Sequence, residues 1–158
     1  MTTRPFIPLA LLVTMACVQE ATIPKIGEQV IELTIAVSHG ELAPGQVDTI
    51  TVSATNHLEQ NVRLVFPTTC QILVYIRNRT SRLVVPEGGS YDCIPVPSQI
   101  VFPAMGTVNR QFIWQGGSDF VPPGTAARLP AGDYFVTATM NAQGYSTSAF
   151  AVRITLLQ

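Results

Sequence analysis

Apolar and polar residues alternate at every second position in several segments of this chain. In the segment VIELTIAVSHG, Ile31, Leu33 and Ile35 alternate with the polar residues Glu32 and Thr34. Successive side chains of a β-strand point to opposite faces, so this pattern predicts a strand with one buried and one exposed face. We expect Ile31, Leu33 and Ile35 to be buried together.

Further segments with strand-like patterns, separated by turn signals, follow along most of the chain. The 12 prolines and 11 glycines are spread between apolar runs as turn signals and form no low-complexity block. No convincing amphipathic helix follows Cys17, and we find no internal repeat. Strands are predicted at residues 31–38, 48–56, 62–67, 71–78, 83–86, 98–103, 108–116, 129–140 and 148–157.

Seven to nine short strands with frequent turns predict an all-β fold. The preferred architecture is an immunoglobulin-like antiparallel β-sandwich, with a closed barrel as the alternative. Residues 30–158 would form this single domain, which is long enough to bury a core. A signal peptide is expected to precede it.

The N-terminal apolar run is too short to cross a membrane. It spans residues 5–18, about 14 residues, and as a helix it would reach about 21 Å, against about 30 Å for a bilayer core. A signal peptide fits better, with Arg4 as its basic region and residues 6–13 as its apolar region.

The end of this run resembles a bacterial lipobox. The residues Thr14-Met15-Ala16-Cys17 stand where that family is cut before a cysteine that carries lipid. The resemblance implies a lipoprotein signal peptide at 1–16, lipidation at Cys17 and a membrane-proximal linker at 17–29. Lipid would anchor the protein to the extracytoplasmic cell envelope. Val18 favours the outer membrane where one exists. Ordinary secretion and an uncleaved start are the alternatives.

The three cysteines support this interpretation. If Cys17 carries lipid, Cys70 and Cys93 remain as a disulfide pair in an oxidising compartment. Their bond would stabilise the fold by ~3 kcal/mol on the chain-entropy account. Two free buried thiols are the alternative. No metal site is predicted, because neither cysteine has a nearby ligand and His39 and His57 are remote in sequence.

Composition argues against several classes of function. Only 12% of residues are charged and the formal net charge is −1, which does not indicate a nucleic-acid partner or an electrostatic membrane-binding surface. The chain has no Gly-rich phosphate loop and no metal-spaced cluster of acidic residues, histidines or cysteines. We therefore expect no cofactor and no metal.

Catalytic residues are not indicated either. Asp48, His57 and several serines are present, but no serine lies in a G-x-S-x-G nucleophile elbow. His57 lies in the polar turn TNHLEQ, where a solvated surface histidine is expected. Trp114 and Phe112 share one face of a predicted strand, which favours a core position for Trp114. The prediction is a protein that is not an enzyme.

Three segments resemble the bacterial family named for the intracellular proteinase inhibitor BsuPI. They are TVSATNHLEQNVRLVFPTTCQILVYIRN at 51–78, RQFIWQG at 110–116 and VPPGTAARLPAGDYFVTA at 121–138. The resemblance covers roughly residues 30–157 and implies an immunoglobulin-like sandwich. This chain adds the Cys70/Cys93 pair, which suits an exported protein.

Two functions follow as expectations. The first is a non-enzymatic cell-envelope lipoprotein whose immunoglobulin-like domain binds a protein partner. The alternative, implied by the family resemblance alone, is a proteinase inhibitor acting on serine proteases. The membrane would be contacted through the N-terminal lipid. The sequence does not identify the partner or a reactive site for inhibition.

Overall fold

The computed structural model describes residues 30–120 and 126–158. The predicted signal peptide, Cys17 and the linker at 17–29 lie outside these ranges. No helix within the described ranges is long and apolar enough to cross a membrane. In chain order the described elements are β1 (Ile31–Val37), β2 (Glu41–Leu42), β3 (Asp48–Asn56), β4 (Val62–Phe66), β5 (Ile72–Asn78), β6 (Leu83–Val85), the 3₁₀ turn η1 (Glu87–Gly89), β7 (Ser98–Phe102), β8 (Thr107–Trp114), β9 (Gly132–Ala142), β10 (Tyr145–Ser148) and β11 (Val152–Leu156).

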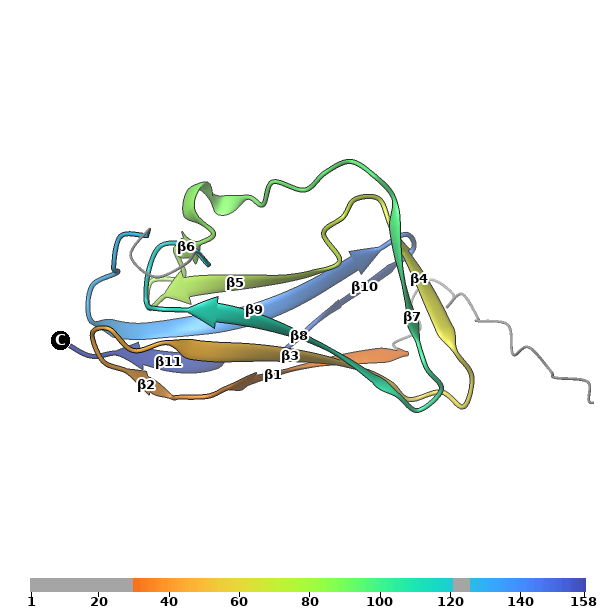
Figure 1. Ribbon diagram of the computed structural model, residues 1–158, viewed down its shortest axis with the longest axis horizontal. Coiled ribbons are helices and arrows are strands. Elements are labelled where there is room, and N and C mark those ends of the chain that lie inside the picture. Colours follow the sequence, from red (N-terminus) through yellow and green to blue (C-terminus); the bar gives the residue numbers. More distant parts are fainter. Residues whose placement is uncertain (1–29, 121–125) are drawn as a thin grey trace, which may run out of the picture.

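The strands form an immunoglobulin-like sandwich (Figure 1). One sheet has the order β1-β3-β8; the other has the order β2-β11-β9-β5-β6, with β10 also paired to β9. These orders match the A-B-E and G-F-C arrangements of immunoglobulin domains. The pairs are antiparallel except β2 with β11, which is parallel. A separate ribbon of β4 and β7 lies at the right-hand end of the view in Figure 1.

Alternating side chains from both sheets build the core, as the sequence predicts. Ile31 and Leu33 are buried, and Glu32 and Thr34 are exposed. Ile35 is only half-buried, because it lies where the edge of β1 borders a groove. The registers of β3 and β9 bury every second residue in the same way.

The two aromatic residues Trp114 and Tyr134 fix one end of the core. Trp114 is fully buried and packs edge-on against the Tyr134 ring, with 6.0 Å between the ring centroids. The Tyr134 hydroxyl, near the start of β9, donates a hydrogen bond of 2.8 Å to the carbonyl of Pro130. This matches the tyrosine corner of immunoglobulin domains, where a tyrosine bonds backbone a few residues upstream.

The structure departs from the predicted strands at two places. β2 lies in a segment that the sequence identifies only as a turn, because two residues are too short to show a period. The final strand, predicted at 148–157, is divided: β10 begins at Tyr145, and residues 149–151 interrupt the path to β11. The inward positions of β10 are Tyr145 and Thr147, whose polarity hides the period.

Candidate functional site

The predicted disulfide is present. Cys70 and Cys93 are bonded with their Cα atoms 5.5 Å apart, within the reach of about 7 Å that a disulfide allows. Cys70 lies in the turn before β5, and Cys93 lies in the connection from η1 to β7. The bond therefore ties a long surface connection to the start of a core strand.

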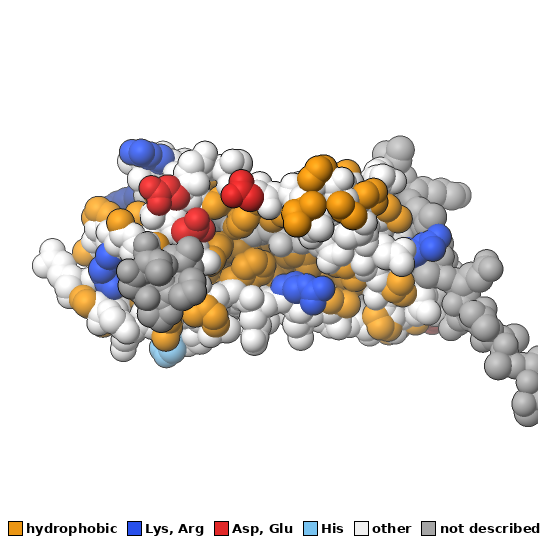
Figure 2. All heavy atoms as spheres, turned by 45° about the horizontal axis from the view of Figure 1, so that its top comes forward, with side chains coloured by type: hydrophobic (Ala, Val, Ile, Leu, Met, Phe, Trp, Pro, Cys, Tyr) orange, Lys and Arg blue, Asp and Glu red, His pale blue; other side chains and the backbone are white. Residues whose placement is uncertain are grey.

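Next to Cys93 the chain exposes four consecutive apolar residues, Ile94, Pro95, Val96 and Pro97. We call residues 94–97 the disulfide-tied loop. Ile94 and Val96 keep 61% and 55% of their surface in solvent. Figure 2 shows hydrophobic side chains gathered over this part of the molecule. Solvent-exposed apolar residues of this kind are scattered singly on most surfaces, so a contiguous group is a candidate interaction site.

Hydrogen bonds hold the disulfide-tied loop against the neighbouring turn. The Thr69 N–H donates to the Ile94 carbonyl at 3.1 Å, and the Ile94 N–H donates to the Thr69 hydroxyl at 3.2 Å. The Val96 N–H donates to the Ile94 carbonyl at 2.8 Å. With the disulfide on one side and Pro95 and Pro97 restricting φ, the loop has little conformational freedom to lose on binding.

Tyr91 anchors the connection upstream of the disulfide. Its ring packs edge-on against Tyr75, with centroids 5.6 Å apart, and its hydroxyl donates to the carbonyl of Val74 in β5. Desolvation by burial, with smaller contributions from Tyr75 and Asp119, raises the pKa of Tyr91 well above its ordinary value. The neutral phenol is therefore the form that fits this site.

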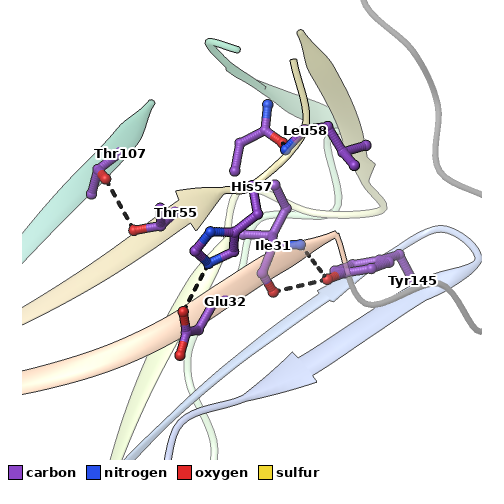
Figure 3. A network of polar contacts seen from close by, with 8 residues as sticks. Ile31, Glu32, Thr55, His57, Leu58, Thr107 and Tyr145 are labelled. Atoms are coloured by element: carbon purple, nitrogen blue, oxygen red, sulfur yellow. Dashed lines mark hydrogen bonds and ion pairs between the residues drawn. The ribbon is translucent and has the colours of Figure 1, made fainter. Parts of the chain in front are cut away.

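A groove of about 600 Å³ lies between β1 and the β10–β11 segment (Figure 3). We call it the edge groove. At one end the Ile31 N–H donates to the Tyr145 hydroxyl, which donates in turn to the Ile31 carbonyl, both at 2.9 Å. At its mouth His57 Nε2 and Glu32 Oε2 are 2.8 Å apart, with 55% and 59% of these side chains exposed.

The residues considered for catalysis do not converge. Asp48 begins β3 and His57 follows its end, so the nine-residue strand separates them by about 30 Å. Asp48 Oδ1 accepts from the Ser38 hydroxyl at 2.7 Å, and that hydroxyl lies 2.9 Å from His39 Nδ1. In a catalytic triad the histidine stands between the serine and the acid. Here the serine bonds the acid directly and ties the β1–β2 corner to β3.

Phe150 is not among the residues that the sequence pattern singles out. This side chain lies between β10 and β11, beside the edge groove, and 97% of its surface is exposed. The only sequence signal is a large aromatic between the small residues Ala149 and Ala151. Alternation predicts a strand that continues through these residues, whereas the structure places them between β10 and β11.

The described residues contain no group of three or more histidine, cysteine, aspartate or glutamate side chains placed to hold a metal ion. Two chemical possibilities remain at these surfaces. An exposed apolar loop on a rigid support can bind an apolar patch of another protein. An open strand edge can hydrogen-bond to an extended chain.

No protein-family model and no curated protein matches this chain. Solved structures resemble it with TM-scores below 0.5. A β-glucosidase from Erythrobacter marinus is 14% identical with a TM-score of 0.45, over 80% of this chain and 16% of that one. The alkylpurine DNA glycosylase AlkC of Pseudomonas fluorescens, bound to DNA, is 11% identical with a TM-score of 0.45, over 82% and 31%. A CARDB domain from Pyrococcus furiosus, in complex with di-metal ions, is 13% identical with a TM-score of 0.43, over 82% and 90%.

Proposed function

We propose that this protein is a non-enzymatic cell-envelope lipoprotein whose immunoglobulin-like domain binds a protein partner through the disulfide-tied loop. The observation that carries the proposal is the exposure of four consecutive apolar residues at 94–97 on a covalently braced support. Exposing such a group to water is unfavourable, and contact with an apolar surface of a partner would remove it from water.

The bracing of the loop bears directly on affinity. A flexible loop loses conformational entropy when it binds, and this loss subtracts from the binding free energy. The disulfide and the hydrogen bonds to Thr69 restrict the loop before any partner arrives. The disulfide is also compatible with an oxidising compartment outside the cytoplasm. A lipid on Cys17 would hold the domain at the membrane surface beside its partner.

A double variant of the loop tests the proposal. The full-length wild-type protein, Ile94→Ser/Val96→Ser and the control Ile113→Ser would each capture partners from solubilised envelopes, with quantification by mass spectrometry. Ile113 is 50% exposed in β8, so its change removes an exposed apolar side chain away from the loop. A partner retained by wild type and the control but lost by the loop variant is expected. A partner that all three proteins retain equally would refute the role of the loop.

The captured partner then requires a direct measurement. Each purified form is titrated with the purified partner, and the loop variant is expected to bind at least about tenfold more weakly than the control. Thermal unfolding of the three forms must agree within a few degrees, so that lost binding is not lost folding.

Proteinase inhibition is the second candidate, and the same loop favours it. The chain at 94–97 is exposed and is tied to its neighbours by a disulfide and by hydrogen bonds on the Thr69 side. A braced segment of this kind can occupy a protease cleft with little entropic loss. Inhibition constants would be measured against trypsin-like, chymotrypsin-like, elastase-like and subtilisin-like proteases. The loop variant should lose any inhibition that wild type has, and an inactive wild type would remove this candidate.

A further inference from the structure

β1 is an edge strand, and the orientation of its backbone groups can be assigned. It pairs with β3 on one side only, within the described part of the chain. The His57 N–H donates to the Val30 carbonyl, and the Ser38 N–H donates to the Thr49 carbonyl. Backbone groups of an antiparallel strand alternate between the two sides. The even-numbered residues from Val30 to Ser38 therefore bond β3, and the odd-numbered residues direct their N–H and C=O groups away from it.

The backbone groups of one outward-facing residue already have a hydrogen-bond partner. Both backbone groups of Ile31 bond the Tyr145 hydroxyl. The N–H and C=O groups of Leu33, Ile35 and Val37 have no hydrogen-bond partner among the described residues. They form a row of alternating donors and acceptors, which is the pattern that another β-strand complements.

The β10–β11 segment, across the edge groove from this row, contains a bulge. Ser148 pairs with Thr139, and Val152 pairs with Val136, so four steps on one strand match three on the other. The extra residue interrupts the ladder and bends the strand. It also directs Phe150 into solvent beside the edge groove. The groove thus has a hydrogen-bonding wall at β1 and an exposed aromatic on the other side.

The side chains that line the edge groove indicate which kind of ligand can bind there. Its two titratable lining residues, Glu32 and His57, contact each other, and its other lining side chains are uncharged. A charged ligand would therefore meet no free counter-charge. β1 contains no lysine or proline, the residues that often block pairing at a strand edge. Its exposed residues include Thr34 and Ala36.

We propose that the edge groove accepts an extended, uncharged segment of a protein partner, which adds to the β1-β3-β8 sheet as a strand beside β1. Its backbone would bond Leu33, Ile35 and Val37, and an apolar side chain would cover Phe150. This surface is separate from the disulfide-tied loop: the groove lies beside β11, whereas the loop follows β6 at the other side of the six-stranded sheet.

Amide hydrogen exchange of the full chain, with and without a peptide, tests the proposal. The probe is the uncharged strand-forming peptide acetyl-Ser-Val-Thr-Ile-Thr-Val-Ser-amide. At saturation, exchange at Leu33, Ile35 and Val37 should slow by at least about tenfold, because their N–H groups become bonded. Exchange at Thr34, which faces β3, should stay unchanged. Unaltered exchange at all three outward amides in the presence of excess peptide would overturn the proposal.

Two variants of the same residue separate backbone from side-chain effects. Ile35→Pro removes an outward N–H, which an edge strand tolerates because that group bonds nothing within the sheet. Ile35→Val keeps the N–H and changes the side chain slightly. Peptide affinity should fall at least about tenfold in Ile35→Pro and remain near wild type in Ile35→Val. Equal affinity in both variants would place the peptide elsewhere, and loss in Ile94→Ser/Val96→Ser instead would assign it to the disulfide-tied loop.

Amide exchange of the protein without peptide provides a further test. If the three outward amides are already protected without peptide, another part of the chain or a second copy occupies the edge, and the proposal is wrong. Sedimentation at two protein concentrations distinguishes those cases, because only pairing between copies depends on concentration.

Discussion

At the scale of single residues, Asn56 shows how one buried amide organises a corner of the sandwich. Its Nδ2 donates to the carbonyls of Gln60 and Pro103 at 2.8 and 2.9 Å, and its Oδ1 accepts from the Leu58 N–H at 3.0 Å. The side chain thus satisfies the turn after β3 and ties it to the end of β7. A buried polar group with this many partners is costly to remove.

We expect Asn56→Ala to lower the free energy of unfolding by about 2–3 kcal/mol, since it removes the hydrogen bonds that the buried amide makes to Gln60, Pro103 and Leu58. Asn109→Ala is the control, because Asn109 is exposed on β8 and its loss should change stability by less than about 0.5 kcal/mol. Urea denaturation measures both. Equal stability of the two variants would show that water replaces the amide.

A second residue-scale prediction concerns Gly116. Its φ is +73°, and a Cβ at this position would lie 2.9 Å from Cδ2 of the buried Leu156. Gly45 has a similar φ of +81° with nothing near its Cβ position. Gly45→Ala should cost about 1–2 kcal/mol from backbone strain alone, and Gly116→Ala about 1–3 kcal/mol more from overpacking. Thermal and urea unfolding of both variants give the difference, which should vanish if Leu156 repacks freely.

At the scale of elements, the connection between β6 and β7 depends on a few fixed points rather than on a buried face. It contains exposed glycines, prolines and apolar side chains, with Tyr91 and Cys93 as its anchors. A segment with so few buried contacts opens at low free energy unless it is tied.

Replacing Cys70 and Cys93 with serine should therefore speed hydrogen exchange at residues 86–98 and leave the core strands protected. The unfolding free energy should fall by about 3 kcal/mol on the chain-entropy account. Exchange measured by mass spectrometry after proteolysis checks the location. Unchanged exchange across 86–98 would show that hydrogen bonds alone order the connection.

The raised pKa of Tyr91 predicts weaker stability in alkali. Unfolded tyrosine loses its proton near pH 10, whereas the folded residue keeps it to higher pH. The folded state then binds more protons than the unfolded state, so stability falls as pH rises above about 10. Urea titrations at pH 9, 10 and 11 should show a steeper fall in wild type than in Tyr91→Phe. Parallel curves would remove Tyr91 as the cause.

At the scale of the whole molecule, the two candidate surfaces lie at opposite sides of the six-stranded sheet. One is an apolar loop and the other is a hydrogen-bonding strand edge, so they are suited to different partner chemistry. Neither relies on charge, in keeping with a chain of net charge −1 and 12% charged residues. Binding at either surface should therefore depend weakly on salt.

The last prediction concerns the processing and membrane localisation of the protein. Mass spectrometry of the native protein should find a mature chain that begins at Cys17 and carries a diacylglyceryl group. Cys17→Ala should move the protein out of the membrane fraction, because no lipid would anchor it. A mature chain that starts at another residue without lipid would contradict this prediction.

The sequence alone determined the features that rest on local patterns. Strict alternation identified β1, β3 and β9 and their buried faces, because strand geometry has a period of two wherever one face is buried. The separation of Cys70 from any metal-ligand partner, together with the compartment inferred from Cys17, led to the disulfide that the structure contains. The spacing of Trp114 to Phe112 likewise predicts the core position that Trp114 occupies.

Features that depend on which strands meet follow from the tertiary fold and not from local sequence. β2 consists of two residues, and its pairing with β11 joins positions more than a hundred residues apart. The bulge that exposes Phe150 appears only when the registers of β10 and β11 on β9 are compared. Alternation specifies which side chains face the core, but the backbone groups at a strand edge are the same for every residue except proline. Whether the edge of β1 stays open is therefore set by neighbouring strands, and no local pattern encodes it.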